Sequence, residues 1–280
     1  MNTSKIKLIF NCAKWTPTVQ EWNLAGSFIQ SEEQRKIAGF YFKDDAKLAL
    51  IARLLIRFAI SCCTNLSWSE INLTRTLKGK PVLVNKDVSL QFNASHDGHY
   101  AAVIADSTCN VGIDIMQLSR QPGNDLNHFF TIMSSKFTDN EWSTIFNYSS
   151  PDDQLRCFYR HWCLKESYVK AIGDGITYPL RDLDFHITSE LSSSPIDIYN
   201  TTLVANQIHL SSWNFEETII DDHCIAVARE SGQHSPSEII KFKELSFKDI
   251  RECAIKLCRE DEVDDKFLQS YTNPYKLLAV

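Results

Sequence analysis

The side chains best suited to chemistry lie on one helical stretch near the middle of the chain. With 3.6 residues per turn, Phe158 and Trp162 share an apolar stripe, and Lys165 falls within that stripe. Glu166 and Lys170 are four residues apart and lie together at its edge. Burying a charge is costly unless a partner compensates it. We therefore expect this helix to face a charged group, with Lys165 turned toward an anion.

A second carboxylate interrupts an apolar strand. Residues 111–116 alternate with period two, which places Gly112, Asp114 and Met116 on one face. Asp114 is a candidate metal ligand, and Gly112 would let a ligand approach the backbone. An acid on a solvent-facing strand would give the same pattern.

A basic turn could hold a polyanion. It carries three positive charges around a glycine, in the run Arg75, Thr76, Leu77, Lys78, Gly79 and Lys80. The tip of an ordinary basic hairpin, with no ligand, would show the same sequence pattern.

A polar loop is expected after the strand at residues 90–93. Its side chains Asn93, Ser95 and His96 suit phosphate oxygens, although a turn with a hydrogen-bonded histidine is the plainer explanation. The consecutive Ser95, His96 and Asp97 cannot form a catalytic triad, whose members converge from separate elements.

Taken together, these groups fit a Mg²⁺-bound pyrophosphate. Magnesium takes one or two protein carboxylates with substrate phosphates and water, and Asp114 and Glu166 would supply the carboxylates. The chain has neither a P-loop nor a dinucleotide-binding glycine motif.

Composition excludes several other classes of protein. The formal net charge of −6 argues against a general nucleic-acid binder. No apolar run approaches the length of a membrane span. The nine cysteines have no zinc-type spacing, so we expect reduced thiols and a cytosolic protein.

The elements that must position these residues follow from periodicity and turn signals. We expect helices at 44–63, 125–133, 139–148 and 152–172, and strands near 6–10, 71–73, 81–84, 90–93, 100–105, 111–116, 183–187, 208–215 and 224–228.

This order predicts an α+β protein of two similar lobes, each with a helix followed by strands. Residues 97–103 and 221–227 share Asp, His, Ala and Val at matching positions, which favours duplication. We expect an N-terminal lobe at 1–110, a C-terminal lobe at 111–230, and a linker and charged tail at 231–280.

The motifs GKP, N-x-SHD, GIDI and W-x-x-KE-x-x-x-K occur in the order that is specific to one family. In this respect the chain resembles the two-lobed, monomeric 4′-phosphopantetheinyl transferases, above all their animal members, over about residues 5–230. The resemblance implies transfer of the phosphopantetheine arm of coenzyme A to a serine of an apo acyl carrier protein, giving adenosine 3′,5′-bisphosphate. It also implies that coenzyme A binds in the cleft between the lobes.

The resemblance also implies roles for individual residues. Asp114 and Glu166 would hold Mg²⁺, Glu166 would take the serine proton, and Lys170 would bind the pyrophosphate or protonate the leaving group. Coenzyme A would contact a further set of residues: Lys36, Arg75, Thr76, Lys78, Gly79, Lys80, Asn93, Ser95, His96 and Lys165.

Two positions depart from the family pattern. Many relatives have a third acid where this chain has Met116, and a thioether is too soft for Mg²⁺. We expect water to replace it, and the animal members also have methionine there. The second departure is Lys36, which stands where relatives carry an arginine for coenzyme A and cannot make a bidentate contact.

Two other hypotheses stay open at this point: a non-catalytic module that binds coenzyme A or a nucleotide, and a scaffold whose charges are all superficial. For an active enzyme, a local basic rim could dock an acidic carrier. The candidates for this rim are Arg53, Arg57, Arg156 and Arg160.

Overall fold

The computed structural model divides the chain into two compact units. The first contains Met1–Thr76, Pro81–Thr108 and Ile240–Val280, and the second contains Leu77–Lys80 and Cys109–Ile239. The structure describes residues 3–85, 87–123, 125–189, 197–230, 240–257 and 262–272.

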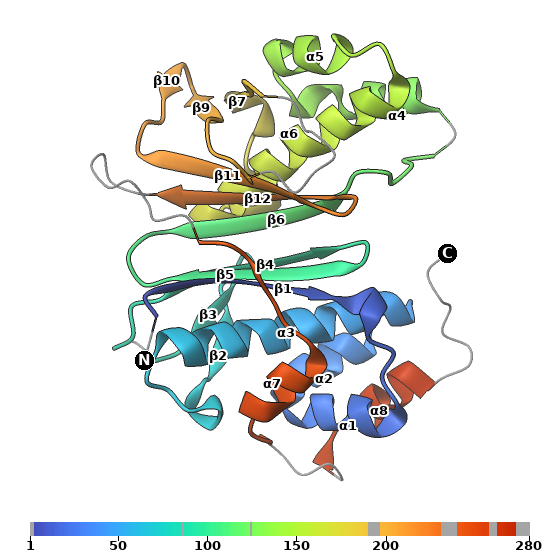
Figure 1. Ribbon diagram of the computed structural model, residues 1–280, viewed down its shortest axis with the longest axis vertical. Coiled ribbons are helices and arrows are strands. Elements are labelled where there is room, and N and C mark those ends of the chain that lie inside the picture. Colours follow the sequence, from blue (N-terminus) through green and yellow to red (C-terminus); the bar gives the residue numbers. More distant parts are fainter. Residues whose placement is uncertain are drawn as a thin grey trace. The chain divides into compact units, whose positions relative to one another are not determined.

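The first unit is built on a four-stranded sheet with the order β13-β1-β5-β4. Helix α3 packs on this sheet, and α1, α2, α7 and α8 pack around α3 (Figure 1). Its elements are β1 (Lys5–Asn11), η1 (Cys12–Lys14), α1 (Val19–Ser27), α2 (Ser31–Ala38), α3 (Lys43–Cys63), η2 (Trp68–Glu70), β2 (Leu73–Arg75), β3 (Pro81–Leu83), β4 (Gln91–Asp97), β5 (Tyr100–Asp106), β13 (Lys243–Glu244), α7 (Phe247–Cys253) and α8 (Asp265–Thr272).

The second unit is built on a sheet with the order β6-β12-β11-β8, and α6 packs against β6 and β12. A smaller sheet has the order β10-β9-β7. The elements are β6 (Val111–Gln117), α4 (Leu126–Met133), η3 (Ser134–Lys136), α5 (Asp139–Phe146), α6 (Pro151–Ile172), η4 (Gly175–Thr177), η5 (Leu180–Asp182), β7 (Leu183–His186), β8 (Asp197–Ile198), β9 (Thr202–Ala205), β10 (Ile208–His209), β11 (Trp213–Ile220) and β12 (His223–Glu230).

Both units follow one plan, and the α+β fold class is confirmed. In each unit an antiparallel hairpin, β4–β5 or β11–β12, has its second strand paired with the first long strand of that unit, β1 or β6. A long helix then covers the sheet. The order is strand, helix, hairpin, whereas the sequence suggested that a helix comes first. The similar segments 97–103 and 221–227 fall on the two hairpin turns and the strands that follow them.

Each unit has its own apolar core. In the first, residues of α3 pack with Phe10, Trp22 and Trp68, and in the second, residues of α6 pack with Phe137 and Phe215. Among the described residues, no helix is both long and apolar enough to cross a membrane.

The described C-terminal segments belong to the first unit and do not form a separate tail. Strand β13 pairs in parallel with β1, with Leu8 opposite Lys243. Trp22 stacks on Phe267 of α8 with ring centroids 5.0 Å apart. These contacts are long-range, and therefore the local charge pattern of the segment did not reveal them. The expected linker at 231–237 lies outside the described residues.

Candidate active site

The site begins with a close contact between β6 and α6. Gly112 lies so near the helix that a Cβ atom there would fall 2.1 Å from the Ser167 carbonyl oxygen and 2.4 Å from the Ala171 nitrogen. Only glycine fits such an approach. Gly112 therefore makes room for a helix backbone, and the ligand expected from the sequence is not what approaches it.

This close contact between β6 and α6 also brings Asp114 near α6. Asp114 is two residues beyond Gly112 and shares its face of the strand, since side chains alternate along β6. Its Oδ1 accepts a hydrogen bond from Lys170 Nζ at 2.5 Å. The Asp114 side chain is 6% exposed and the Lys170 side chain is 30% exposed. Two of the predicted residues thus meet at a partly open position.

Glu166 completes a like-charged pair with Asp114. Burial raises the pKa of Glu166, the negative charge of Asp114 raises it further, and Lys170 partly offsets both effects. The two carboxylates are therefore close enough to repel each other. A cation placed between such groups would relieve the repulsion.

Lys165 does not face the site, and its predicted contact with coenzyme A is wrong in this structure. Its Nζ lies 2.7 Å from Glu141 Oε2, and neither side chain is exposed. It also donates to the carbonyl oxygens of Leu180 at 2.9 Å and Leu183 at 2.5 Å. The charge within the apolar stripe is therefore satisfied inside the second unit.

Glu141 is the residue that sequence reasoning missed. Its backbone and side chain form a capping box with Thr138 at the start of α5. Its Oε1 accepts from the Phe185 nitrogen at 3.1 Å. The spacing Thr138-x-x-Glu141 could have predicted the helix start, but nothing local indicates that the same carboxylate pairs with Lys165.

The basic turn is anchored at the C-terminal end of α6. Lys78 Nζ lies 2.5 Å from Asp174 Oδ1, and Lys80 Nζ donates to the Ala171 carbonyl at 3.2 Å. Burial lowers the pKa of Lys80. The structure thus brings Lys78, Gly79 and Lys80 near the helix turn that carries Lys170.

Lys36 and Arg75, two other residues predicted to contact coenzyme A, both lie near the Glu32 carboxylate in the first unit. Lys36 lies on α2, and its Nζ is 2.6 Å from Glu32 Oε1. The hydrogen bond and charge of Lys36 lower the pKa of Glu32, and Arg75 contributes to the same shift. Arg75, at the end of β2, and the next residue, Thr76, are both exposed.

Asn93, Ser95 and His96 lie within β4 and not in a loop. Strand β4 continues to Asp97, beyond the expected end at 93, and pairs with β5 along its length. Alternation places Asn93 and Ser95 on one face, both buried, while exposed His96 is on the other. His96 therefore lies on the opposite face of β4 from Asn93 and Ser95, and not beside them in a loop.

Two of the four arginines proposed for carrier docking are buried. Arg57 is 0% exposed and donates to the Ile71 carbonyl at 2.9 Å. Arg160 is 2% exposed and pairs with Glu217 at 2.6 Å. The side chain of Arg53 is 12% exposed and that of Arg156 is 30% exposed. Of the four arginines, Arg156 is therefore the most accessible to a carrier.

Known families match both parts of the chain. Residues 13–108 match "4'-phosphopantetheinyl transferase, N-terminal", and residues 110–228 match "4'-phosphopantetheinyl transferase superfamily". The chain therefore belongs to the 4′-phosphopantetheinyl transferase superfamily, whose members transfer phosphopantetheine from coenzyme A to carrier proteins, and this is the activity of the chain.

Individual relatives cover most of the chain. It is 39% identical to L-aminoadipate-semialdehyde dehydrogenase-phosphopantetheinyl transferase of Mus musculus over 91% of this chain and 88% of that protein. The Homo sapiens protein of the same name is 38% identical with the same coverage. A phosphopantetheinyl transferase of Thraustochytrium sp. is 32% identical over 78% of this chain and 76% of that protein.

Proposed function

We propose that Asp114 and Glu166 make this transferase dependent on magnesium. The observation that supports this most strongly is the pair itself: two carboxylates from β6 and α6, close enough that one raises the pKa of the other. Hard oxygen ligands of this number suit Mg²⁺, which completes its shell with phosphate and water.

The position of Met116 fits two protein ligands and not three. Met116 shares the face of β6 with Asp114 and pairs across the sheet with Cys224. Neither sulfur-bearing side chain is a ligand that Mg²⁺ prefers. In the part of the chain that the structure describes, no three His, Cys, Asp or Glu side chains cluster as a metal site. Asp114 and Glu166 would then be the two protein ligands.

The reaction needs a base, and Glu166 is suited to that role. The carrier serine Oγ forms a bond to the phosphorus that bears the pantetheine arm, its proton passes to Glu166, and the bond from phosphorus to the adenosine bisphosphate oxygen breaks. A carboxylate within reach of the serine hydroxyl can act as such a base. Bound Mg²⁺ would neutralise charge on the pyrophosphate oxygens and make phosphorus more electrophilic.

Lys170 would stabilise the leaving phosphate. Its Nζ is within hydrogen-bonding reach of Asp114, and its side chain is 30% exposed, so it can also meet a ligand. We assign phosphate contacts in the same unit to Lys78, Gly79 and Lys80, because the turn is held near the end of α6. Roles for Lys36, Arg75, Thr76, Asn93, Ser95 and His96 remain predictions from the family resemblance.

The acceptor is a carrier domain. Because the animal relatives are named for L-aminoadipate-semialdehyde dehydrogenase, a carrier domain of that enzyme is the first acceptor to test, beside a free acyl carrier protein. We also expect a cytosolic monomer, which cell fractionation and light scattering would check.

Calorimetric titration of coenzyme A, with and without Mg²⁺, tests the metal assignment without requiring turnover. The wild-type protein should bind coenzyme A at least ten times more tightly with Mg²⁺, and Asp114→Ala should lose that gain. Glu252→Gln, which removes an exposed carboxylate of α7, is the matched control. An Asp114→Ala protein that retains the full magnesium effect would contradict the assignment.

A further inference from the structure

A pocket in the first unit is separate from the residues assigned to the transferase reaction. It has a volume of about 540 Å³ and is lined by residues from β1, η1, α1, β13 and α7. Ligand pockets in proteins span roughly 300–1,000 Å³, so a small molecule fits this one. It contains no residue of the Asp114–Glu166 site and does not depend on the proposed function.

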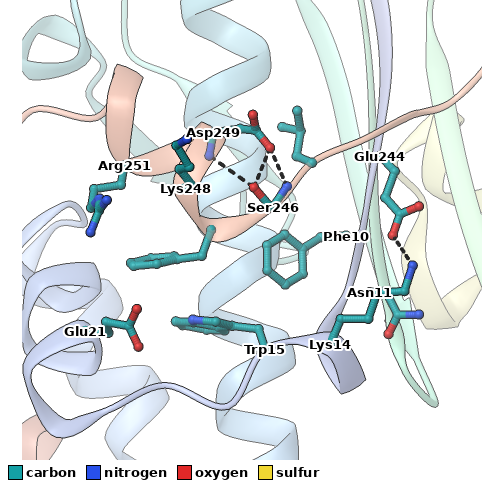
Figure 2. Close-up of a pocket in the computed structure, with 12 residues that line it drawn as sticks. Phe10, Asn11, Lys14, Trp15, Glu21, Glu244, Ser246, Lys248, Asp249 and Arg251 are labelled. Carbon is teal, nitrogen blue, oxygen red and sulfur yellow. Dashed lines mark hydrogen bonds and ion pairs between the residues drawn. The ribbon is translucent and has the colours of Figure 1, made fainter.

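Aromatic side chains form the apolar part of the pocket. Trp15 stacks on Phe247 with ring centroids 4.6 Å apart, and it meets Phe10 edge-on at 6.0 Å. Figure 2 shows Phe10 and Trp15 in the middle of the residues drawn, with charged side chains around them. Such a surface suits a flat ring or an acyl chain.

The indole nitrogen of Trp15 points to a missing acceptor. Trp15 is 8% exposed, and its buried Nε1 has no hydrogen-bond partner among the residues described. The indole nitrogen can only donate, and leaving a buried donor unpaired is costly. A ligand that brings an acceptor oxygen would satisfy it.

The acidic residues that line the pocket already have partners. Glu21 Oε2 accepts from the Thr18 nitrogen at 3.0 Å. Asp249 Oδ2 accepts from the Ser246 nitrogen at 2.7 Å. In Figure 2 dashed lines mark the bonds of Asp249.

Glu244 is engaged as well, since its Oε1 lies 2.8 Å from Lys14 Nζ. The three carboxylates are thus held by the protein itself. They do not call for a cationic ligand.

The basic residues of α7 are less well satisfied. Arg251 forms no hydrogen bond or ion pair with another described residue. Lys248 Nζ is 3.8 Å from Glu252 Oε1, and the two side chains are 74% and 61% exposed. Ion pairs on the surface contribute little to stability. The polar groups that remain for a ligand are therefore donors.

We propose that this pocket binds a small amphipathic anion, an aromatic or acyl group that ends in a carboxylate or sulfonate. The apolar part packs on Phe10, Trp15 and Phe247. The anionic group lies toward Lys248 and Arg251, and an acceptor oxygen meets Trp15 Nε1.

Two dyes that differ in one group test the anion requirement. The first is 8-anilinonaphthalene-1-sulfonate, and the second is N-phenyl-1-naphthylamine, which has the same rings without the sulfonate. Fluorescence titration of the full chain should show one site for the sulfonate, with the neutral dye at least tenfold weaker. Equal affinities for the two dyes would overturn the proposal, as would the absence of a saturable site.

Substitutions locate that site. The double variant Lys248→Ala with Arg251→Ala should weaken sulfonate binding at least tenfold. Trp15→Phe, which keeps a ring and removes the donor, should weaken it several-fold. Lys266→Ala removes an exposed lysine of α8 outside the pocket and should leave binding within twofold. Circular dichroism checks folding of each variant. A double variant within twofold of wild type would contradict the pocket assignment.

Discussion

Lys165 and Glu141 form an ion pair with charged atoms 2.7 Å apart and no exposure of either side chain. The pair joins α6 to α5, and its further hydrogen bonds reach η5 and β7. Glu166 is the next residue along α6. The pair therefore fixes the rotation of the helix that presents Glu166, and Lys165 supports the site without being part of it.

Breaking this pair on one side should destabilise the protein strongly. Lys165→Met leaves the Glu141 carboxylate buried without its cation, and loss of one partner in such a pair costs about 3–5 kcal/mol. The double variant Lys165→Met with Glu141→Leu should recover much of the loss, because no unpaired charge remains. Urea unfolding of the single and double variants measures this, and additive losses would show that the two charges do not interact.

Gly112 should tolerate no side chain. In Gly112→Ala the new Cβ would fall 2.1 Å from a backbone oxygen of α6, which cannot move without parting the helix from β6. We expect a loss of stability of more than about 3 kcal/mol, at the upper end for overpacking, together with reduced turnover. Gly39→Ala is the milder comparison, since its Cβ would lie 3.3 Å from the Lys36 carbonyl oxygen, a tight contact that a small shift can relieve. Equal unfolding midpoints for the two variants would show that the contact is loose.

His161 should make the protein sensitive to acid. Burial lowers its pKa from 6.5 to about 3, so the folded protein keeps it neutral while the unfolded chain takes up a proton below pH 6.5. Its contribution is present above that pH and is lost as the pH falls toward 3. At pH 5 the loss is about 2 kcal/mol.

The variant His161→Leu tests this assignment. Urea unfolding at pH 7.5 and at pH 5 should show a smaller difference in stability for the variant than for the wild-type protein. If both proteins lose the same stability between these pH values, another group is responsible.

Lys170 should affect turnover more than folding. Lys170→Met removes the positive charge that opposes the raised pKa of Glu166 and the proposed partner of the leaving phosphate. We expect kcat to fall at least 100-fold, about 2.7 kcal/mol of transition-state stabilisation. Lys170→Arg should retain part of the activity because the charge is kept. Steady-state kinetics with both variants decides this, and a kcat within threefold of wild type for Lys170→Met would remove Lys170 from the mechanism.

The central residues of the site were predictable because their signals are local. Helical spacing places Glu166 and Lys170 on one edge, and strand alternation turns Asp114 away from its apolar neighbours. Both patterns survive in the structure, where Lys170 meets Asp114. The helix expected at 44–63, which the structure has at Lys43–Cys63, was predictable for the same reason.

The residues whose surroundings were predicted wrongly are held by long-range contacts. The sequence shows that Lys165 needs an anion but not that Glu141 supplies it from another helix. Likewise, Arg57 is buried because its guanidinium reaches the Gln30 side chain at 2.7 Å. Helical periodicity alone predicted that Arg57 lies at the edge of the buried face of α3, where it could have been exposed.

Some elements were missed although a local signal existed. The capping box of Thr18 and Glu21 begins α1, and that of Ser246 and Asp249 begins α7. Both follow the spacing that predicts a helix start. The pairing of β13 with β1 has no such signal, because only the folded chain brings the two strands together.

The most direct test of the proposed site is transfer to a carrier, read by intact mass. The protein is incubated with Mg²⁺, coenzyme A and an apo acyl carrier protein, in parallel with Glu166→Gln and the control Glu252→Gln. If Glu166 has the proposed role, the carrier should gain one phosphopantetheine with the wild type and the control, and none with Glu166→Gln over the same time. Labelling by Glu166→Gln at a rate near that of the wild type would contradict it.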